Sequence, residues 1–218
     1  MNTLSRCRDG YIQNEWNRFY TSALYAQKGP RMSRFFGGAR QVGFVVHDIE
    51  KAMAHWSRVL GVGPWFYKEE VGTTEFRYYG QPSALPDLSI ALANSGDLQI
   101  ELIQQRNDAP SLYLDSLQRS GEGAQHIAYW TEDRFDELAA QLTASGYVEG
   151  HGGQMGQRGR FAYYVHPDLP SGMIELSELT GGKGDYFRRI AEASRDWDGS
   201  DPIRRMGASA VGASIDVR

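Results

Sequence analysis

The sequence predicts an α+β fold made of two βαβββ modules related by a duplication. The stretch that begins at Gln41 reads QVGFVVHD, and the stretch that begins at His126, 85 residues later, reads HIAYWTED. In each copy a polar residue opens an apolar run that ends at an aspartate. A second shared motif, Ile-Glu-Leu, contains Glu101 in the first copy and Glu175 in the second. A repeat of this length indicates two supersecondary modules that build one shared site.

The composition of the 218-residue chain favours a small-molecule partner. A formal net charge of −4 offers no basic surface for nucleic acid or an anionic membrane. Cys7 is the only cysteine, so an intrachain disulfide is excluded and a reducing compartment fits. No apolar run reaches the length of a membrane helix, and the N-terminal residues lack the apolar core of a signal peptide. These observations predict a cytoplasmic protein without nucleic-acid or membrane partners.

The first module is predicted over residues 39–105, after an extension of residues 1–38 that contains one amphipathic helix. Its first strand is followed by Asp48, whose side chain suits the N-cap of a helix that ends at Gly61. The remaining β-rich segments of this module lie near residues 64–70, 74–80 and 87–105, the last of which is broken into a hairpin.

The second module is predicted over residues 125–182, behind a connector of residues 106–124 in which Ser111 starts a short helix. Asp133 is expected to cap the helix of this module, and Gly146 to end it. Its later strands are expected near residues 147–151, 160–165 and 173–178, with a mobile glycine-rich loop at 151–159. The remaining residues, 183–218, are predicted to form a helix near 185–197 and a disordered tail from about residue 206.

Four polar residues occupy equivalent positions in the two modules. Gln41 and His126 stand at the head of the first strands, and Glu101 and Glu175 lie inside the last strands. If both sheets curl around a common pseudo-twofold axis, the four side chains converge. Three oxygen ligands and one imidazole suit a single divalent ion such as Zn, Ni, Co, Mn or Mg. An ionised glutamate between an isoleucine and a leucine is costly to bury unless it is paired or bound to a metal.

Each of these residues alone has a simpler explanation. A strand glutamate usually faces solvent, and a single histidine is more often a hydrogen-bonded surface or core residue. Their shared position in two copies favours the metal site. Weaker candidates for substrate contact, for which a solvated edge or core packing is the default, are Glu70, Tyr79, Tyr129 and Tyr164. His151 could also touch substrate from the loop.

Residues 39–180 resemble the vicinal oxygen chelate superfamily, which comprises glyoxalases, bleomycin-resistance proteins and extradiol dioxygenases. The resemblance is carried by the QVGFVVHDIEKA segment that starts at Gln41, by the connector from Ser111 to Gly123, and by the two Ile-Glu-Leu strands. It implies a cup of curled sheet around a divalent metal. The connector looks most like that of methylmalonyl-CoA epimerases. The ligand types look like those of glyoxalase I, which implies that the metal ligands are Gln41, Glu101, His126 and Glu175.

The sequence also departs from its apparent relatives. Epimerases of this type generally have histidine at the position of Gln41 and often glutamine at that of Glu101, so this chain has an extra carboxylate. Extradiol dioxygenases use two histidines and one carboxylate, and Gln41 therefore disfavours their chemistry. Bleomycin-resistance relatives lose the metal, whereas all four positions here remain chelating.

The resulting prediction is a metal-dependent isomerase, epimerase or lyase that acts on a carbonyl compound through a metal-stabilised enolate. Glu175 or Glu101 would serve as the base. The first alternative is a metal-free protein of the same fold that binds or sequesters a small molecule. A metal-dependent ring-cleaving oxygenase is the third reading. The substrate and the oligomeric state stay open, and a homodimer is the commonest soluble assembly.

Overall fold

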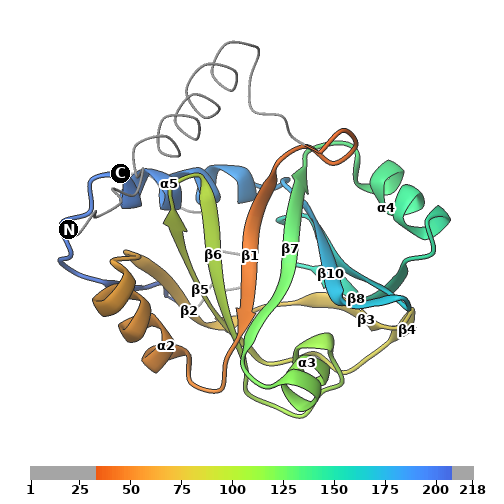
Figure 1. Cartoon of the computed structure of the whole chain (residues 1–218), viewed down its shortest axis with the longest axis horizontal. Helices are drawn as coiled ribbons and strands as arrows, with labels where there is room; N and C mark the ends of the chain where they lie inside the picture. Colours follow the sequence, from red (N-terminus) through yellow and green to blue (C-terminus); the bar gives the residue numbers. More distant parts are fainter. Residues whose placement is uncertain (1–32, 208–218) are drawn as a thin grey trace, which may run out of the picture. The chain divides into compact units, whose positions relative to one another are not determined.

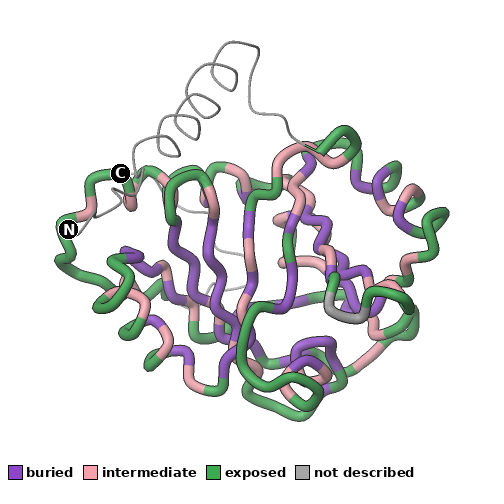
Figure 2. The backbone as a smooth tube through the Cα atoms, viewed as in Figure 1, coloured by how far each residue is buried: buried purple, intermediate pink, exposed green. Residues whose placement is uncertain are grey.

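The computed structural model of the chain describes residues 33–207 (Figures 1 and 2). The predicted N-terminal helix and the tail after Gly207 lie outside these residues. The described part confirms the α+β class, because its strands form one large curled and unclosed sheet with a few helices against it. None of its helices is long and apolar enough to cross a membrane.

The elements follow the predicted repeat in chain order. The first half and the connector contain β1 (Ala39–Val45), α2 (Ile49–His55) continued by the π-helix η1 (Trp56–Leu60), β2 (Trp65–Val71), β3 (Thr74–Tyr78), β4 (Gln81–Pro82), β5 (Leu88–Ser95), β6 (Leu98–Gln105) and α3 (Leu112–Ser120). The second half contains β7 (Gly123–Thr131), α4 (Phe135–Ala144), β8 (Val148–Gln154), β9 (Arg160–His166), β10 (Leu169–Glu178), α5 (Lys183–Arg195) and β11 (Ile203–Arg205).

The sheet order shows the duplication directly. The strands run β11-β2-β5-β6-β1-β7-β10-β9-β8-β3-β4, with β1 and β7 antiparallel at the centre (Figure 1). Each of these central strands pairs in parallel with the last strand of its own module, β1 with β6 and β7 with β10. A pseudo-twofold axis between β1 and β7 therefore relates the two halves.

One expected strand of the first module lies in the other half of the sheet. The segment near residues 74–80 was expected to belong to the sheet of the first module. Instead, β3 pairs with β8 of the second module, and β4 pairs with β3. Arg77 of β3 forms an ion pair with Glu149 of β8 at 3.0 Å, and Phe76 packs in a core cluster with Phe161. Burial of Phe76 and pairing of the exposed edge of β8 favour this crossing.

The predicted helix caps are correct in two of three cases. Asp48 Oδ1 accepts a hydrogen bond from Lys51 N at 3.0 Å, and Ser111 Oγ accepts from the backbone nitrogens at the start of α3. The prediction for Asp133 is wrong, because Thr131 Oγ1 accepts from Arg134 N at 2.9 Å instead. A threonine hydroxyl two residues upstream of Asp133 thus satisfies the free donor at this helix entry.

The glycine-rich segment at 151–159 is only partly a loop. Its first residues belong to β8, which is held between β9 and β3. A Cβ at Gly152 would press on the carbonyl oxygen of Phe161, and one at Gly153 on that of Thr74. These two glycines are therefore explained by the close approach of neighbouring strands, not by a turn.

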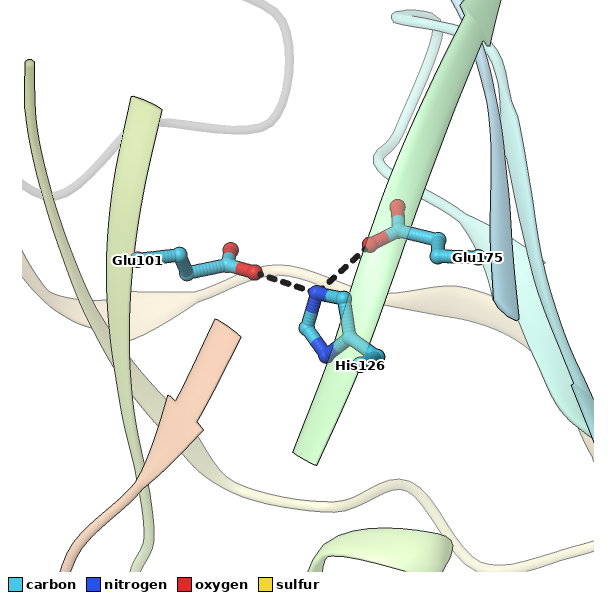
Figure 3. Close-up of side chains that lie close together, drawn as sticks. All are labelled: Glu101, His126 and Glu175. Atoms are coloured by element: carbon cyan, nitrogen blue, oxygen red, sulfur yellow. Dashed lines mark ion pairs between the residues drawn. The ribbon is translucent and has the colours of Figure 1, made fainter. Parts of the chain in front are cut away.

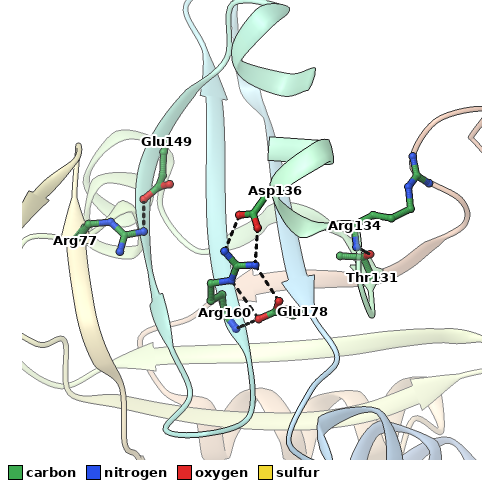
Figure 4. A network of polar contacts seen from close by, with 7 residues as sticks. All are labelled: Arg77, Thr131, Arg134, Asp136, Glu149, Arg160 and Glu178. Atoms are coloured by element: carbon green, nitrogen blue, oxygen red, sulfur yellow. Dashed lines mark hydrogen bonds and ion pairs between the residues drawn. The ribbon is translucent and has the colours of Figure 1, made fainter. Parts of the chain in front are cut away.

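Helices cover the outer faces of the two halves. Ile49 and Met53 of α2 pack on β6 and its neighbours, and Leu138 of α4 packs on β9 and β10. A polar network outside the second half joins α4 to the sheet (Figure 4), in which Arg160 contacts Asp136 at 2.7 Å and Glu178 at 2.9 Å. The candidate functional site lies in the interior between the two halves.

Candidate metal centre

Three of the four predicted ligands converge between the modules. His126 Nε2 on β7 lies 3.3 Å from Glu101 Oε2 on β6 and 3.1 Å from Glu175 Oε2 on β10 (Figure 3). The ligand atoms all lie within 4.8 Å of one another, and all three residues are buried. They form the candidate metal site.

Strand alternation explains why both glutamates point inward. Ile100 and Leu102, on either side of Glu101, pack in the core beneath α2. Leu176 packs beneath α4 in the same way, so Glu175 also faces the interior. Because successive side chains of a strand point to opposite faces, each apolar pair forces its glutamate into the space between the modules.

The central strand pair makes room for the histidine. Gly43 of β1 lies directly opposite His126 of β7 in the sheet register. A Cβ at Gly43 would overlap the imidazole ring, so only glycine leaves space for the ring in this position. The glycine of the QVGFVVHD motif is thus part of the site.

The inward atoms of the cluster lack hydrogen bonds. The contacts of His126 Nε2 with the two carboxylates are short but do not have hydrogen-bond geometry, and among residues 33–207 Nε2, Glu101 Oε2 and Glu175 Oε2 have no other partner. Buried polar atoms are normally satisfied. One imidazole nitrogen and two carboxylate oxygens that converge without hydrogen-bond partners fit a divalent ion of the Zn, Ni, Co, Mn or Mg kind.

Gln41, the fourth predicted ligand, is hydrogen-bonded to a neighbouring glutamine. It is buried, lines the same cavity as the two glutamates, and donates a hydrogen bond from Nε2 to Gln99 Oε1 at 2.8 Å. Because the amide nitrogen is held by Gln99, the amide oxygen is the atom that Gln41 could offer to an ion. Gln99 was not predicted, although it lies two residues before Glu101 on the same face of β6.

Burial and neighbouring charges shift the pKa values of the three clustered residues in different directions. Burial lowers the pKa of His126, but the two adjacent carboxylates outweigh burial and raise it to about 9. Burial raises the pKa of Glu101. Burial also acts to raise that of Glu175, but the contact with His126 and the charge of Lys183 outweigh it and lower the pKa. The site therefore attracts positive charge.

A cavity of about 340 Å³ opens onto the cluster. Most of its wall is apolar or aromatic and comes from both halves and from α5, including Leu88, Ile90, Tyr113, Phe161, Tyr163 and Phe187. Four basic side chains also line it, namely Lys68, Arg158, Lys183 and Arg189. Sequence reasoning missed these cations, since none has a counterpart in the repeat.

The weaker candidates for substrate contact lie elsewhere. Glu70 and Tyr79 are exposed, Tyr129 contacts Phe36, and Tyr164 packs in the core beneath α4, so none of the four lines this cavity. The neighbouring Tyr163 faces the cavity instead. Both tyrosines are 3% exposed, and the sequence pattern therefore could not show which one points inward.

His151 is a structural residue of the core behind Tyr163. It is fully buried in β8, and its Nδ1 accepts a hydrogen bond from Leu112 N at 3.2 Å. Burial lowers its pKa to about 3, which keeps the ring neutral. The ring packs 4.4 Å from the ring of Tyr163 and not against the open cavity.

Comparisons with known proteins agree with this architecture. The family model described as the glyoxalase/bleomycin resistance protein/dioxygenase superfamily matches residues 40–164. Methylmalonyl-CoA epimerase from Mycobacterium tuberculosis is similar in structure, at 19% identity over 73% of this chain and 97% of that one, with a TM-score of 0.51.

A Streptomyces coelicolor methylmalonyl-CoA epimerase in complex with 2-nitronate-propionyl-CoA has 21% identity, a TM-score of 0.44 and coverage of 66% of this chain and 94% of its own. No curated protein matches the sequence. At these identities the structural likeness shows the fold alone. The extent of the family match shows the family: the chain belongs to the glyoxalase/bleomycin resistance protein/dioxygenase superfamily.

Proposed function

We propose that this protein is a divalent-metal-dependent isomerase or epimerase, or a lyase of related chemistry, that acts on a small carbonyl compound. The proposal rests on one observation: His126 Nε2, Glu101 Oε2 and Glu175 Oε2 converge, without hydrogen-bond partners among residues 33–207, beside a largely apolar cavity. Methylmalonyl-CoA epimerase from Mycobacterium tuberculosis, which shares the fold, belongs to this reaction class and supports the proposal.

The donor set indicates how the ion would be held. Glu101, His126 and Glu175 would bind it, and the amide oxygen of Gln41, which lines the same cavity, is a further donor. A bound divalent ion supplies Lewis acidity that polarises a carbonyl oxygen and favours loss of a proton from the adjacent carbon.

The chain's own residues would perform the proton transfer. One carboxylate, that of Glu175 or Glu101, accepts the proton from the carbon next to the carbonyl and returns it to the same or a neighbouring carbon. The aromatic walls provided by Tyr113 and Tyr163 keep water away from that carboxylate and hold an apolar substrate against it. Return to the opposite face gives an epimer, and return to a neighbouring carbon gives an isomer.

The direct test is solvent deuterium exchange into a panel of carbonyl compounds with acidic α-hydrogens, followed by NMR. The wild-type protein loaded with a divalent ion should catalyse incorporation of deuterium into at least one of these compounds. At least one of the variants Glu175→Gln and Glu101→Gln should reduce the exchange rate by about 100-fold or more, as expected for loss of a general base. Glu70→Gln, which changes an exposed glutamate outside the cavity, is the matched control. Unchanged exchange in both site variants would refute the proposal.

A metal-free binding protein is the second candidate function. It is favoured by the composition of the cavity wall, which consists mainly of apolar and aromatic side chains. This reading predicts that a hydrophobic ligand binds equally well to wild-type protein and to His126→Ala, without any deuterium exchange. The two readings are thus separated by the same set of variants.

A further inference from the structure

Helix α5 adds a basic residue to the cavity from a part of the chain that the family match does not cover. The match ends at residue 164, whereas α5 spans Lys183–Arg195. The helix packs against β5 of the first half (Figure 1), where its Phe187 and Ile190 contact Leu92. Lys183, in its first turn, lines the cavity together with Glu175.

The ammonium group of Lys183 is buried with little to compensate its charge. The residue is 7% exposed, and Nζ donates a hydrogen bond to Ser177 Oγ at 2.5 Å. In the part of the chain that the structure describes, no carboxylate forms an ion pair with this nitrogen. A buried lysine without an ion pair is unusual, because the desolvation of its charge is costly. Its place in the first turn of a helix is also unfavourable, since this end carries the positive pole of the helix dipole.

The position of Ser177 fixes where the ammonium points. Ser177 and Glu175 are two residues apart on β10 and therefore share the inward face of that strand. Lys183 Nζ thus lies on the same wall as the proposed base. Glu175, Glu101 and Glu178 attract it electrostatically, but the first two are metal ligands in the proposed function and Glu178 forms an ion pair with Arg160. A negative group on a bound substrate would then be the natural partner of this ammonium.

We propose that Lys183 is a substrate-positioning residue that binds a carboxylate of the substrate, so that the substrate is an oxo acid or a related carbonyl compound that carries a carboxylate near the reacting carbon. This inference rests on the proposed function, because it assigns the substrate class of the same site. The charge-assisted hydrogen bond from Nζ would orient the α-carbon toward the Glu175 carboxylate. Ser177 holds the lysine side chain in place.

The test is calorimetric binding of matched probes, with no need for turnover. Acetoacetate and levulinate are each compared with the corresponding neutral amide, which keeps the ketone and replaces the carboxylate. Wild-type protein loaded with a divalent ion should bind at least one acid about tenfold more tightly than its amide, since charge-assisted hydrogen bonds are stronger than neutral ones. Lys183→Met should lose this preference, and Lys183→Arg should retain most of it.

Arg188→Met is the control, because Arg188 lies on the exposed side of the same helix and does not line the cavity. Circular dichroism melting establishes that each variant is folded. A wild-type protein that shows no preference, or a preference that survives in Lys183→Met, would overturn the assignment of Lys183. Metal retention and deuterium exchange are measured separately, so failure of the proposed function is recognised even when the carboxylate preference is present.

Discussion

At the scale of single residues, the sequence predicts the inward orientation of some side chains of this site and not of others. Glu101 and Glu175 could be placed because each sits between apolar neighbours in a repeated strand, which leaves one inward orientation. Lys183 could not be placed, because it has no counterpart in the other module. The choice between Tyr163 and Tyr164 also could not be made, since both faces of β9 are buried.

A residue-scale prediction follows from the contact between the central strands. Gly43→Ala should displace the ring of His126, weaken retention of a divalent ion by at least tenfold and destabilise the fold by about 1–3 kcal/mol, the usual cost of overpacking. Gly72→Ala is the control, because a Cβ at that exposed glycine meets no atom within 4 Å. Metal titration and urea unfolding measure the two effects. A Gly43→Ala protein that binds the ion as well as wild type would show that the ring position is not required.

At the scale of elements, two of the three helix entries and the local strands were predictable from the sequence, whereas the partner of an edge strand was not. Asp48 and Ser111 act locally on the backbone nitrogens that follow them, so their side chains were sufficient signals. The partner of β3 depends instead on the free edge of β8, which lies far along the chain. Alternating residues define a strand but do not identify the edge that it joins.

The ion pairs of Arg160 give an element-scale prediction about pH. The Arg160 guanidinium holds the pKa of Glu178 below its ordinary value of 4.5. Because the pKa of Glu178 is lower in the folded than in the unfolded state, its charge stabilises the fold fully above pH 4.5. This stabilisation is lost as the pH falls through the folded-state pKa. Glu178→Gln should therefore lower the free energy of unfolding at pH 6 by about 0.5–1 kcal/mol and have little effect at pH 3, because a partly exposed pair contributes modestly.

Urea unfolding at the two pH values measures this difference. Glu132→Gln provides the control, since Glu132 is an exposed glutamate. An equal loss of stability at pH 6 and pH 3 would indicate that Glu178 acts through packing and not through its charge.

At the scale of the whole molecule, the duplication accounts for the sheet and for the convergence of the site. The order of strands on either side of β1 and β7 is the same, which brings equivalent residues of the two modules to one place. The positions of α5 and β11 do not follow from the duplication, because both elements lie outside the repeat. Strand β11, which pairs with β2, was not predicted. Homodimer formation and a cytoplasmic location remain predictions from the sequence.

The central claim is that one divalent ion binds where the two halves meet. Metal content after dialysis, measured by plasma mass spectrometry on wild type, His126→Ala and Glu101→Ala, tests it most directly, with His47→Ala as a control on an exposed histidine. We expect one equivalent of ion in wild type and His47→Ala, and none in the two site variants. A wild-type protein that retains no ion after loading, or site variants that retain a full equivalent, would contradict the claim.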